Sequence, residues 1–414
     1  MGYNRRAFIR QMGTAGLIST SGLAPAIWSR AIQAGSGTQA ASAERVLVVV
    51  QLAGGNDGLN TVVPYADDAY HRARPGIGLS ESSVLKLNDT LGLHPQMQGL
   101  KELYDEGRLS IVQGVGYANP DRSHFRSTDI WQSARLATDG SLDGWLGRAL
   151  DSSRDLHEGR VPAMAVGSER LPLALVAQDV AVPTMRDLKA YQLQLGPQPE
   201  QNQQLFRSTI GSHVQQSAST AGQQLDFLRR AVDSALTTAD TVQQIAEGYR
   251  ETVSYPETEL ARKLKLTAQL ISGDLGTRIF FVSQDGFDTH SRQQQAHQAL
   301  LGELSSALRA FCLDLKGHGH ADRVVVATFS EFGRRVAENG SLGTDHGAAS
   351  QVLVVTPGKQ GGIHGRHPDL SDLDDGDLRY HTDFRSVYAT LLETWLQIPS
   401  QPVLGAAFPL LQFI

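Results

Sequence analysis

Three continuous apolar runs along the chain each lead toward a polar, glycine-rich cluster. The apolar runs are residues 45–52, 278–282 and 323–329. Short runs of this kind, rich in β-branched residues, are typical of parallel strands that helices cover on both faces. The polar clusters are residues 54–58, 286–290 and 343–347. Because ligands of open α/β sheets bind beyond the carboxyl ends of the strands, we expect these clusters to form one functional site.

Other apolar patterns extend the same architecture. The strands that we predict in addition are residues 109–113 and 352–355, and the helices are residues 95–107, 301–317 and 384–396. Alternation of strands and helices predicts an α/β fold with a mostly parallel central sheet and helices on both faces. A Gln- and Ser-rich stretch followed by leucines at helical spacing predicts a helical insertion at roughly 195–265.

The N-terminal residues have the pattern of an export signal. Arg5 and Arg6 precede a stretch rich in Gly, Ala and Ser, and no acidic residue occurs before Glu44. Paired arginines in this setting are typical of a twin-arginine signal. We therefore predict a signal peptide at 1–43, with cleavage after Ala43 favoured over cleavage after Ala34. The twin-arginine machinery would then deliver the protein to the periplasm or the cell exterior.

The remaining chain, residues 44–414, is predicted to form one domain. Removal of the four arginines before Glu44 leaves 33 basic against 43 acidic residues, a formal charge of about -10. This acidic balance argues against non-specific nucleic-acid binding. No transmembrane span is predicted in the mature chain, because no later stretch is long and apolar enough. The single Cys312 excludes an internal disulfide.

The polar clusters contain the side chains that bind divalent metal ions. Aspartate and neutral histidine are ligands for hard and borderline cations, and their distribution over separate loops suits a site assembled at a sheet edge. The Asp and His residues of the clusters are Asp57, Asp288, His290, Asp345 and His346. One or two ions are expected, and these residue types do not distinguish Zn, Mn, Mg and Ca.

Several short motifs occur together in one order along the chain. They are Gly54-Gly55-Asn56-Asp57-Gly58, Arg122-Ser123-His124-Phe125, Gly144-Trp145-Leu146-Gly147-Arg148, Phe287-Asp288-Thr289-His290, Ser330-Glu331-Phe332-Gly333-Arg334, Thr344-Asp345-His346-Gly347 and Asp383-Phe384-Arg385. With these motifs the chain resembles the domain of unknown function 1501 family, twin-arginine-exported bacterial proteins grouped with the alkaline phosphatase and sulfatase superfamily. The resemblance spans nearly the whole mature chain.

The resemblance implies an alkaline-phosphatase-like α/β sandwich with a two-metal site. Position by position, the implied ligands are Asp57, Asp288, His290, Asp345 and His346, with Asp285 as an alternative acid. The superfamily usually supplies one further histidine, for which His364 is the candidate and His381 the second choice. Glu331 follows a strand where the superfamily places an Asp-His pair, so it is a further candidate ligand, with pairing to an arginine as the alternative.

The resemblance also implies a nucleophile after the second strand. Ser123 is the first choice because it precedes a helix there, and Ser127 and Thr128 are rivals at the helix entrance. His124 lies next to Ser123 and is expected to reach the site. The Arg122 and Arg126 side chains are candidates for binding the non-bridging oxygens of an anionic ester.

Two functions follow as hypotheses. The first is a metal-dependent hydrolase of phosphate or sulfate esters, with a Ser nucleophile and a small or polymer-borne substrate. The second is an exported binding or assembly protein in which the metal site is structural or degenerate. The choice between them depends on metal content and on turnover of simple aryl esters.

Overall fold

The computed structural model describes residues 45–137, 140–153, 161–178, 180, 182–186, 245 and 248–414. The predicted signal peptide at 1–43 and most of the predicted insertion at 195–265 lie outside the described residues. Within the described part, no helix has the length and apolar character needed to cross a membrane.

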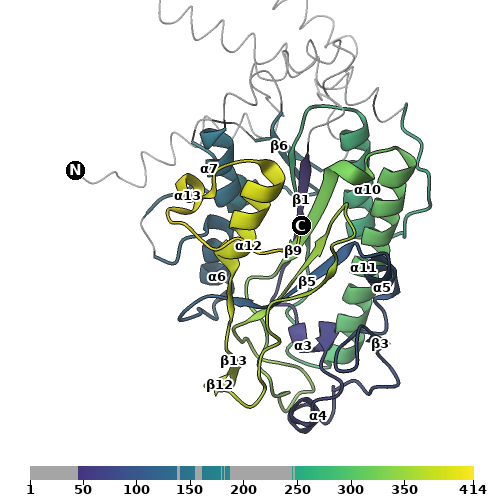
Figure 1. Cartoon of the computed structure of the whole chain (residues 1–414), viewed down its shortest axis with the longest axis vertical. Helices are drawn as coiled ribbons and strands as arrows, with labels where there is room; N and C mark the ends of the chain where they lie inside the picture. The colour runs from purple at the N-terminus through teal and green to yellow at the C-terminus, as the bar shows by residue number, and fades with distance from the viewer. Residues whose placement is uncertain are drawn as a thin grey trace, which may run out of the picture.

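A nine-stranded sheet forms the centre of the molecule (Figure 1). Its order is β11-β5-β10-β9-β1-β8-β6-β7, with β14 also paired to β5. The strands are β1 (Val46–Leu52), β5 (Leu109–Gly116), β6 (Ala163–Val166), β7 (Thr184–Met185), β8 (Ile279–Gln284), β9 (Val324–Phe329), β10 (Ser350–Val355), β11 (Gly362–His364) and β14 (Thr382–Asp383). Every pairing described in this sheet is parallel except those of β10. The predicted mostly parallel α/β fold is therefore confirmed.

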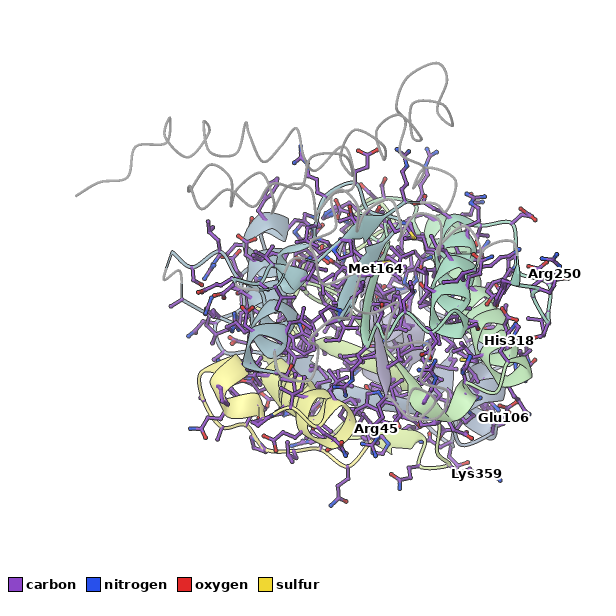
Figure 2. All side chains as sticks on the ribbon, turned by 90° about the horizontal axis from the view of Figure 1, so that it is seen from above. Arg45, Glu106, Met164, Arg250, His318 and Lys359 are labelled. Carbon is purple, nitrogen blue, oxygen red and sulfur yellow. The ribbon has the colours of Figure 1, made fainter. Side chains whose placement is uncertain are left out.

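Helices cover both faces of the sheet, and Figure 2 shows the strands between two helical layers. One layer contains α5 (Gln98–Asp105), α10 (Glu259–Ser272) and α11 (Gln293–Gly317). The other contains α6 (His124–Ser133), α7 (Trp145–Ser152), α12 (Phe384–Thr390) and α13 (Ser400–Leu404). In β1, Val46, Val48 and Val50 face the first core and Leu47 and Val49 face the second. This burial on both faces explains the continuous apolar run.

The helix predicted at 384–396 is an α-helix only in its first half. α12 ends at Thr390, and a π-helix, Leu391–Leu396, continues it. In the wider turn, Trp395 Nε1 donates a hydrogen bond to the Val46 carbonyl at 2.9 Å. The π-helix therefore ties this segment to the start of β1.

Shorter elements surround the sheet. They are α3 (Gly58–Thr61), β2 (Val62–Val63), α4 (Asp68–Ala73), β3 (Leu85–Lys86), β4 (Gly92–Leu93), β12 (Leu373–Asp374), β13 (Asp377–Leu378) and the 3-10 helices Leu173–Leu175 and Ala321–Arg323. The segment after Pro64, which lacks a clear pattern in the sequence, contains α4, β3 and β4, and these two strands form a three-stranded sheet with β2. Asp67 caps α4 by accepting a hydrogen bond from the Ala69 amide at 2.7 Å.

The strand directions bring distant loops to one edge of the sheet. β1, β5, β8 and β9 point the same way, so the loops that follow them leave at the same edge. β10 runs in the opposite direction, and its first residue therefore lies at that edge too. Residues 343–349, which precede β10, join the loops after the parallel strands there. The chain topology thus gathers all three polar clusters.

Candidate metal centre

Three imidazoles and one carboxylate converge at this edge. The Asp288 Oδ1 atom lies 3.4 Å from His124 Nε2, 3.0 Å from His290 Nε2 and 3.2 Å from His346 Nε2. The ligand-type atoms of His124, Asp288 and His346 all lie within 4.8 Å of one another. Two nitrogens bound to one zinc ion at roughly 2.1 Å would lie about 3.4 Å apart in a tetrahedral site. The spacing of the cluster is therefore close to that of a metal-ligand set.

Each imidazole presents its Nδ1 atom to a hydrogen-bond acceptor. The acceptors are the Glu331 carboxylate for His124 at 3.0 Å, the Asp345 carboxylate for His290 at 3.4 Å and the Arg122 carbonyl for His346 at 2.8 Å. Each of these partners can accept a proton from Nδ1, and the tautomer with the proton on Nδ1 leaves Nε2 as the lone-pair atom that a cation would bind. Histidines that bind metal through Nε2 are oriented in this way by an acceptor at Nδ1.

The lone pairs of two of these rings face each other. His290 Nε2 and His346 Nε2 are 2.9 Å apart. Two unprotonated nitrogens at this distance repel unless a proton or a metal ion lies between them. Burial lowers the pKa of His346, which disfavours the proton at this position. The pair therefore fits a metal ion.

The charges of the site also fit a cation. The Asp288, Asp345 and Glu331 carboxylates contact the cluster, whereas Arg334 provides one compensating positive charge. Two negative charges remain, the number that one divalent ion neutralises. Burial raises the pKa of Asp288, but the hydrogen bond and the positive charge of Arg334 outweigh it, and the pKa falls to about 2. Asp288 is thus ionised at neutral pH.

Two buried atoms in and beside the cluster have no hydrogen-bond partner among the described residues. They are His124 Nε2 and Glu331 Oε2. A buried polar atom without a partner costs about 1–3 kcal/mol, and an ion or an ordered water is a common explanation. The Asp288 and His290 side chains are 48% and 42% exposed, so the cluster is open to solvent on one side. A bound ion would thus be accessible to a substrate.

Arg334 connects the loops that carry these residues. Its buried guanidinium donates to the Gly55, Thr344 and Phe287 carbonyls at 2.6, 2.8 and 3.0 Å, and to Asp288 Oδ1 at 2.8 Å. It also donates to the Gly54 carbonyl. One side chain therefore holds the loops after β1 and β8 and before β10 together.

The two glycines after β1 permit close packing beneath the cluster. A Cβ atom on Gly54 would lie 2.4 Å from the Asp288 amide nitrogen, and one on Gly55 would lie 2.1 Å from Phe332 Cε2. Both glycines also have positive φ angles, which larger residues rarely adopt. Phe332 in turn packs against the rings of His124 and His346, with centroid distances of 4.9 and 4.5 Å. The glycines therefore leave room for the Phe332 ring, which packs against both histidine rings.

Gln293, the first residue of α11, links the ligand loops to the interior. Its Oε1 accepts hydrogen bonds from Thr289 at 3.2 Å and Thr344 at 2.6 Å. These threonines are neighbours in sequence of the Asp and His residues of the cluster. The side-chain amide nitrogen of Gln293, Nε2, donates a hydrogen bond to Asp57 Oδ2. Gln293 thus fixes the spacing between the two loops.

Asp57 lies outside the cluster, although the sequence made it a candidate ligand. It is fully buried and forms an ion pair with the buried Arg74 at 2.6 Å. It also accepts from Gln293 and from the Asn60 amide, and so caps α3. Burial raises the pKa of Asp57, but the attraction and hydrogen bond of Arg74 reverse this effect and lower it overall. The structure therefore gives Asp57 the role of an interior anchor.

The residues proposed for nucleophilic and anion-binding roles have different environments. Ser123 is exposed at the N-terminal end of α6, and its side chain makes no capping hydrogen bond. Arg122 pairs with Asp377 at 2.5 Å, and Arg126 donates to the Leu136 carbonyl. Ser127 Oγ donates to the Asp121 carbonyl at 2.5 Å. The structure thus engages both arginines elsewhere and leaves Ser123 exposed, next in sequence to the cluster residue His124.

The remaining candidates do not join the cluster. His364 lies on β11, at the far side of β5 from β10, and its ring is 6.4 Å from that of Phe413. The backbone amide of His381 donates to the Gly114 carbonyl, and its side chain is exposed. Asp285 accepts a hydrogen bond from Ser283 at 2.9 Å and is also exposed. The additional histidine of the cluster is His124.

Comparison with known proteins identifies the family. The model of the family described as protein of unknown function (DUF1501) matches residues 43–396. The chain belongs to this family. The resemblance drawn from the sequence motifs of this DUF1501 protein is thereby confirmed at the family level. A search of curated proteins gave no match.

Solved structures similar to this DUF1501 protein include three from bacteria. The PsFucS1 sulfatase from Pseudoalteromonas sp. has 10% sequence identity and a TM-score of 0.36, over 92% of this chain and 71% of the sulfatase. A protein in the alkaline phosphatase superfamily from Vibrio parahaemolyticus has 10% identity and a TM-score of 0.40, over 92% and 77%. The alkaline phosphatase from the Antarctic bacterium TAB5 has 9% identity and a TM-score of 0.31, over 77% and 94%. Similarity at this level does not indicate activity.

Proposed function

We propose that this DUF1501 protein is an exported metal-dependent hydrolase of anionic esters, of the phosphate or sulfate class. The observation that carries the proposal is the convergence of three imidazole Nε2 atoms on the Asp288 carboxylate at an open sheet edge. The class of ester follows from the resemblance of the sequence motifs to the alkaline phosphatase and sulfatase superfamily.

The chain supplies a coherent set of ligands. His124, His290, His346 and Asp288 would hold one divalent ion, and Asp345 lies beside His290 as a further carboxylate. When bound, such an ion polarises the ester and lowers the pKa of a nearby hydroxyl group. Glu331 keeps the His124 ring in the orientation that presents Nε2. The solvent-exposed side of the cluster would admit the substrate.

Ser123 is the proposed nucleophile. The preceding residue, Arg122, contacts His346 through its carbonyl, and the following residue is His124, so the Ser123 backbone is fixed on both sides. Its hydroxyl has no capping hydrogen bond. The free amides at the start of the ten-residue α6 favour negative charge that develops there.

The proposal is tested by turnover of aryl phosphate and aryl sulfate esters. The full-length protein is stripped with a chelator and reloaded separately with Zn²⁺, Mn²⁺, Mg²⁺ or Ca²⁺. We expect metal-dependent turnover of one ester class, and its loss by several orders of magnitude in Ser123→Ala. Ser127→Ala is the matched control, because its hydroxyl already donates to Asp121; this variant should retain turnover.

Metal content separates the proposal from its rival. A protein that binds a stoichiometric ion but turns over none of the esters, with Ser123→Ala indistinguishable from wild type, would be an exported binding or assembly protein. A protein that binds no ion after reloading would contradict the hydrolase and leave only a binding or assembly protein with a degenerate site.

Export is the second part of the proposal. It rests on Arg5 and Arg6 and on the absence of acidic residues before Glu44. Replacement of both arginines by lysine should retain the protein in the cytoplasm, as measured by cell fractionation, because the twin-arginine machinery reads the arginine pair. Unchanged delivery of the double variant to the periplasm would contradict this assignment.

A further inference from the structure

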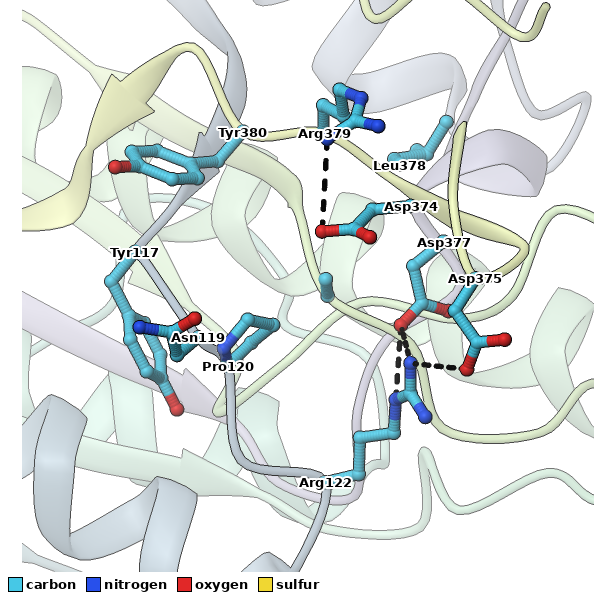
Figure 3. Close-up of a pocket in the computed structure, with 11 residues that line it drawn as sticks. Tyr117, Asn119, Pro120, Arg122, Asp374, Asp375, Asp377, Leu378, Arg379 and Tyr380 are labelled. Carbon is cyan, nitrogen blue, oxygen red and sulfur yellow. Dashed lines mark hydrogen bonds and ion pairs between the residues drawn. The ribbon is translucent and has the colours of Figure 1, made fainter. Parts of the chain in front are cut away.

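A hollow of about 260 Å³, shown in Figure 3, is lined in part by the loops that carry the cluster histidines. Arg122 and Ala348 line it, and they lie two residues from the cluster histidines His124 and His346. The Arg122 carbonyl accepts the hydrogen bond of His346, whereas its guanidinium reaches into the wall of the hollow. A group bound there is therefore within a few ångströms of the loops that carry the ligands.

The polar wall of the hollow is built by the β12–β13 hairpin. Its turn residues Asp375 and Gly376 have φ angles of 51° and 83°, the conformation of a tight hairpin turn that favours an Asp-Gly sequence. The turn places Asp374 and Asp377 beside each other in the ladder and on the lining of the hollow. The acidic residues are thus presented by a defined element.

Asp377 has unused hydrogen-bonding capacity. The residue is 2% exposed, and its Oδ2 atom accepts two hydrogen bonds from Arg122, at 2.5 and 2.9 Å. Its Oδ1 atom has no hydrogen-bond partner among the described residues. Arg335 Nε lies 3.8 Å from it, beyond hydrogen-bonding distance. A buried carboxylate oxygen of this kind calls for a donor such as a hydroxyl group.

The charges of the hollow are nearly balanced. Arg122 and Arg335 each lie near both Asp375 and Asp377, and Arg379 NH1 lies 3.7 Å from Asp374, so three guanidinium groups compensate three carboxylates. These pairings disfavour a metal cation or an anion as the occupant. The wall instead offers both carboxylate acceptors and guanidinium donors, the combination that hydroxyl groups need because each one donates and accepts.

The opposite wall is aromatic. In Figure 3, Tyr117 and Tyr380 lie across the hollow from the acidic hairpin. Tyr117 is buried, and Tyr380 is 38% exposed although it is a large aromatic residue. A volume of 260 Å³ is just below the range of roughly 300–1,000 Å³ for drug-sized ligands. The hollow therefore suits one ring with an apolar face and a hydroxylated edge.

From this arrangement, and resting on the proposed function, we propose that the hollow binds an uncharged sugar unit, the part of the substrate that carries the ester. The tyrosines would contact the apolar face of the ring. Asp374, Asp377 and Arg379 would bind its hydroxyl groups. The substrate of the site would then be a sugar phosphate or a sugar sulfate.

The test measures binding of unesterified sugars, which needs neither turnover nor metal. Saturation-transfer NMR on the full-length protein uses uncharged methyl hexosides and methyl 6-deoxyhexosides, a methyl glycoside with an amine and one with a carboxylate. At least one uncharged glycoside should bind, equally in metal-loaded and metal-stripped protein. Tyr380→Ala should weaken its binding by roughly two- to tenfold, the range of one aromatic contact.

Charge-matched variants locate the contact. Asp374→Asn should also weaken binding, because it removes an acceptor from the lining. Asp372→Asn is the control, since Asp372 bonds the same Arg379 at 2.9 Å but does not line the hollow; it should bind as wild type does. The proposal would be overturned if no uncharged glycoside bound, or if only the amine glycoside bound. It would also be overturned if Tyr380→Ala and Asp374→Asn both bound the glycoside as tightly as wild type does. Ester turnover without sugar binding would overturn this inference and leave the hydrolase intact.

Discussion

Replacement of Asp57 by Asn should lower stability and leave metal binding intact. Asp57 and Arg74 are both fully buried and lie 2.6 Å apart. Removal of one partner of a buried pair costs about 3–5 kcal/mol, because the other charge is left without compensation. At present Asp57 Oδ2 accepts hydrogen bonds from both Arg74 and Gln293. In the Asp57→Asn variant, the uncharged amide that replaces the carboxylate would face these two donors.

The magnitude is measured by a double-mutant cycle. Urea unfolding in chelator, followed by tryptophan fluorescence, gives the free energy of unfolding of Asp57→Asn, Arg74→Met and the double variant. The double variant should lose at least about 1 kcal/mol less than the sum of the single losses, since it leaves no lone buried charge. Arg74 also donates to the Val336 and Arg335 carbonyls, so the Arg74→Met loss includes those bonds.

Metal content of the folded fraction completes this test. After size exclusion, elemental analysis should find the wild-type stoichiometry in Asp57→Asn and loss of metal in Asp288→Asn. The reasoning is refuted if Asp57→Asn keeps wild-type stability but loses its metal. In that case Asp57 would be a ligand, and its pairing with Arg74 would not describe the folded protein.

Three further predictions concern the interior around the cluster. Burial lowers the pKa of His94 and of His297 from 6.5 to about 4. As the pH falls, these histidines therefore take up protons in the unfolded chain before they do so in the folded protein. The free energy of unfolding in chelator should be at its full value above pH 6.5 and should fall between pH 6.5 and 4. Each histidine contributes up to about 1.4 kcal/mol per pH unit, so His297→Gln should give a shallower slope in urea unfolding at stepped pH, and an unchanged slope would count against its burial in the neutral form. Gly55→Ala should cost more than Gly140→Ala in the same assay, because both have positive φ but only a Cβ on Gly55 would clash, at 2.1 Å from Phe332; equal costs would contradict the packing described. Gln293→Ala should weaken metal affinity by roughly 10–100-fold in chelator competition, whereas its exposed neighbour Gln294→Ala should not, and equal affinities would show that Gln293 does not position the ligand loops.

The central strands and their direction were predictable because their sequence carries the information directly. β1, β8 and β9 are buried on both faces, so nearly every position is apolar and the runs are continuous. Polar clusters that follow parallel strands must lie at one edge, which is why Asp288 and His290 lie beside the loop that follows β1. Residues 343–349 reach that edge for another reason, the antiparallel direction of β10, which local sequence does not specify.

The environment of Asp57 was not predictable from its motif. Its partner Arg74 follows α4, a short helix in a segment without a clear hydrophobic period. An Asp after a strand has the same local pattern whether it binds a metal or a buried guanidinium. The choice is made by tertiary packing, which here brings Arg74 to its carboxylate.

The supporting residues of the cluster were also hidden in the sequence. Gln293 is one of three consecutive glutamines, and only its position at the start of α11 directs it inward. Arg334 stood in a recognised motif, but its contacts with several loops depend on their assembly. The resemblance pointed to His364 or His381 as the further histidine, whereas the third imidazole of the cluster is His124, which Glu331 orients through a hydrogen bond that the sequence does not reveal.

Anomalous diffraction from crystals grown with Zn²⁺ or Mn²⁺ tests the central claim most directly. We predict an anomalous peak within bonding distance of Asp288 and of the Nε2 atoms of His290 and His346, and no peak at Asp57. A peak coordinated by Asp57, or a well-ordered cluster without any peak in a protein that retains metal elsewhere, would contradict the assignment of this edge as the metal centre.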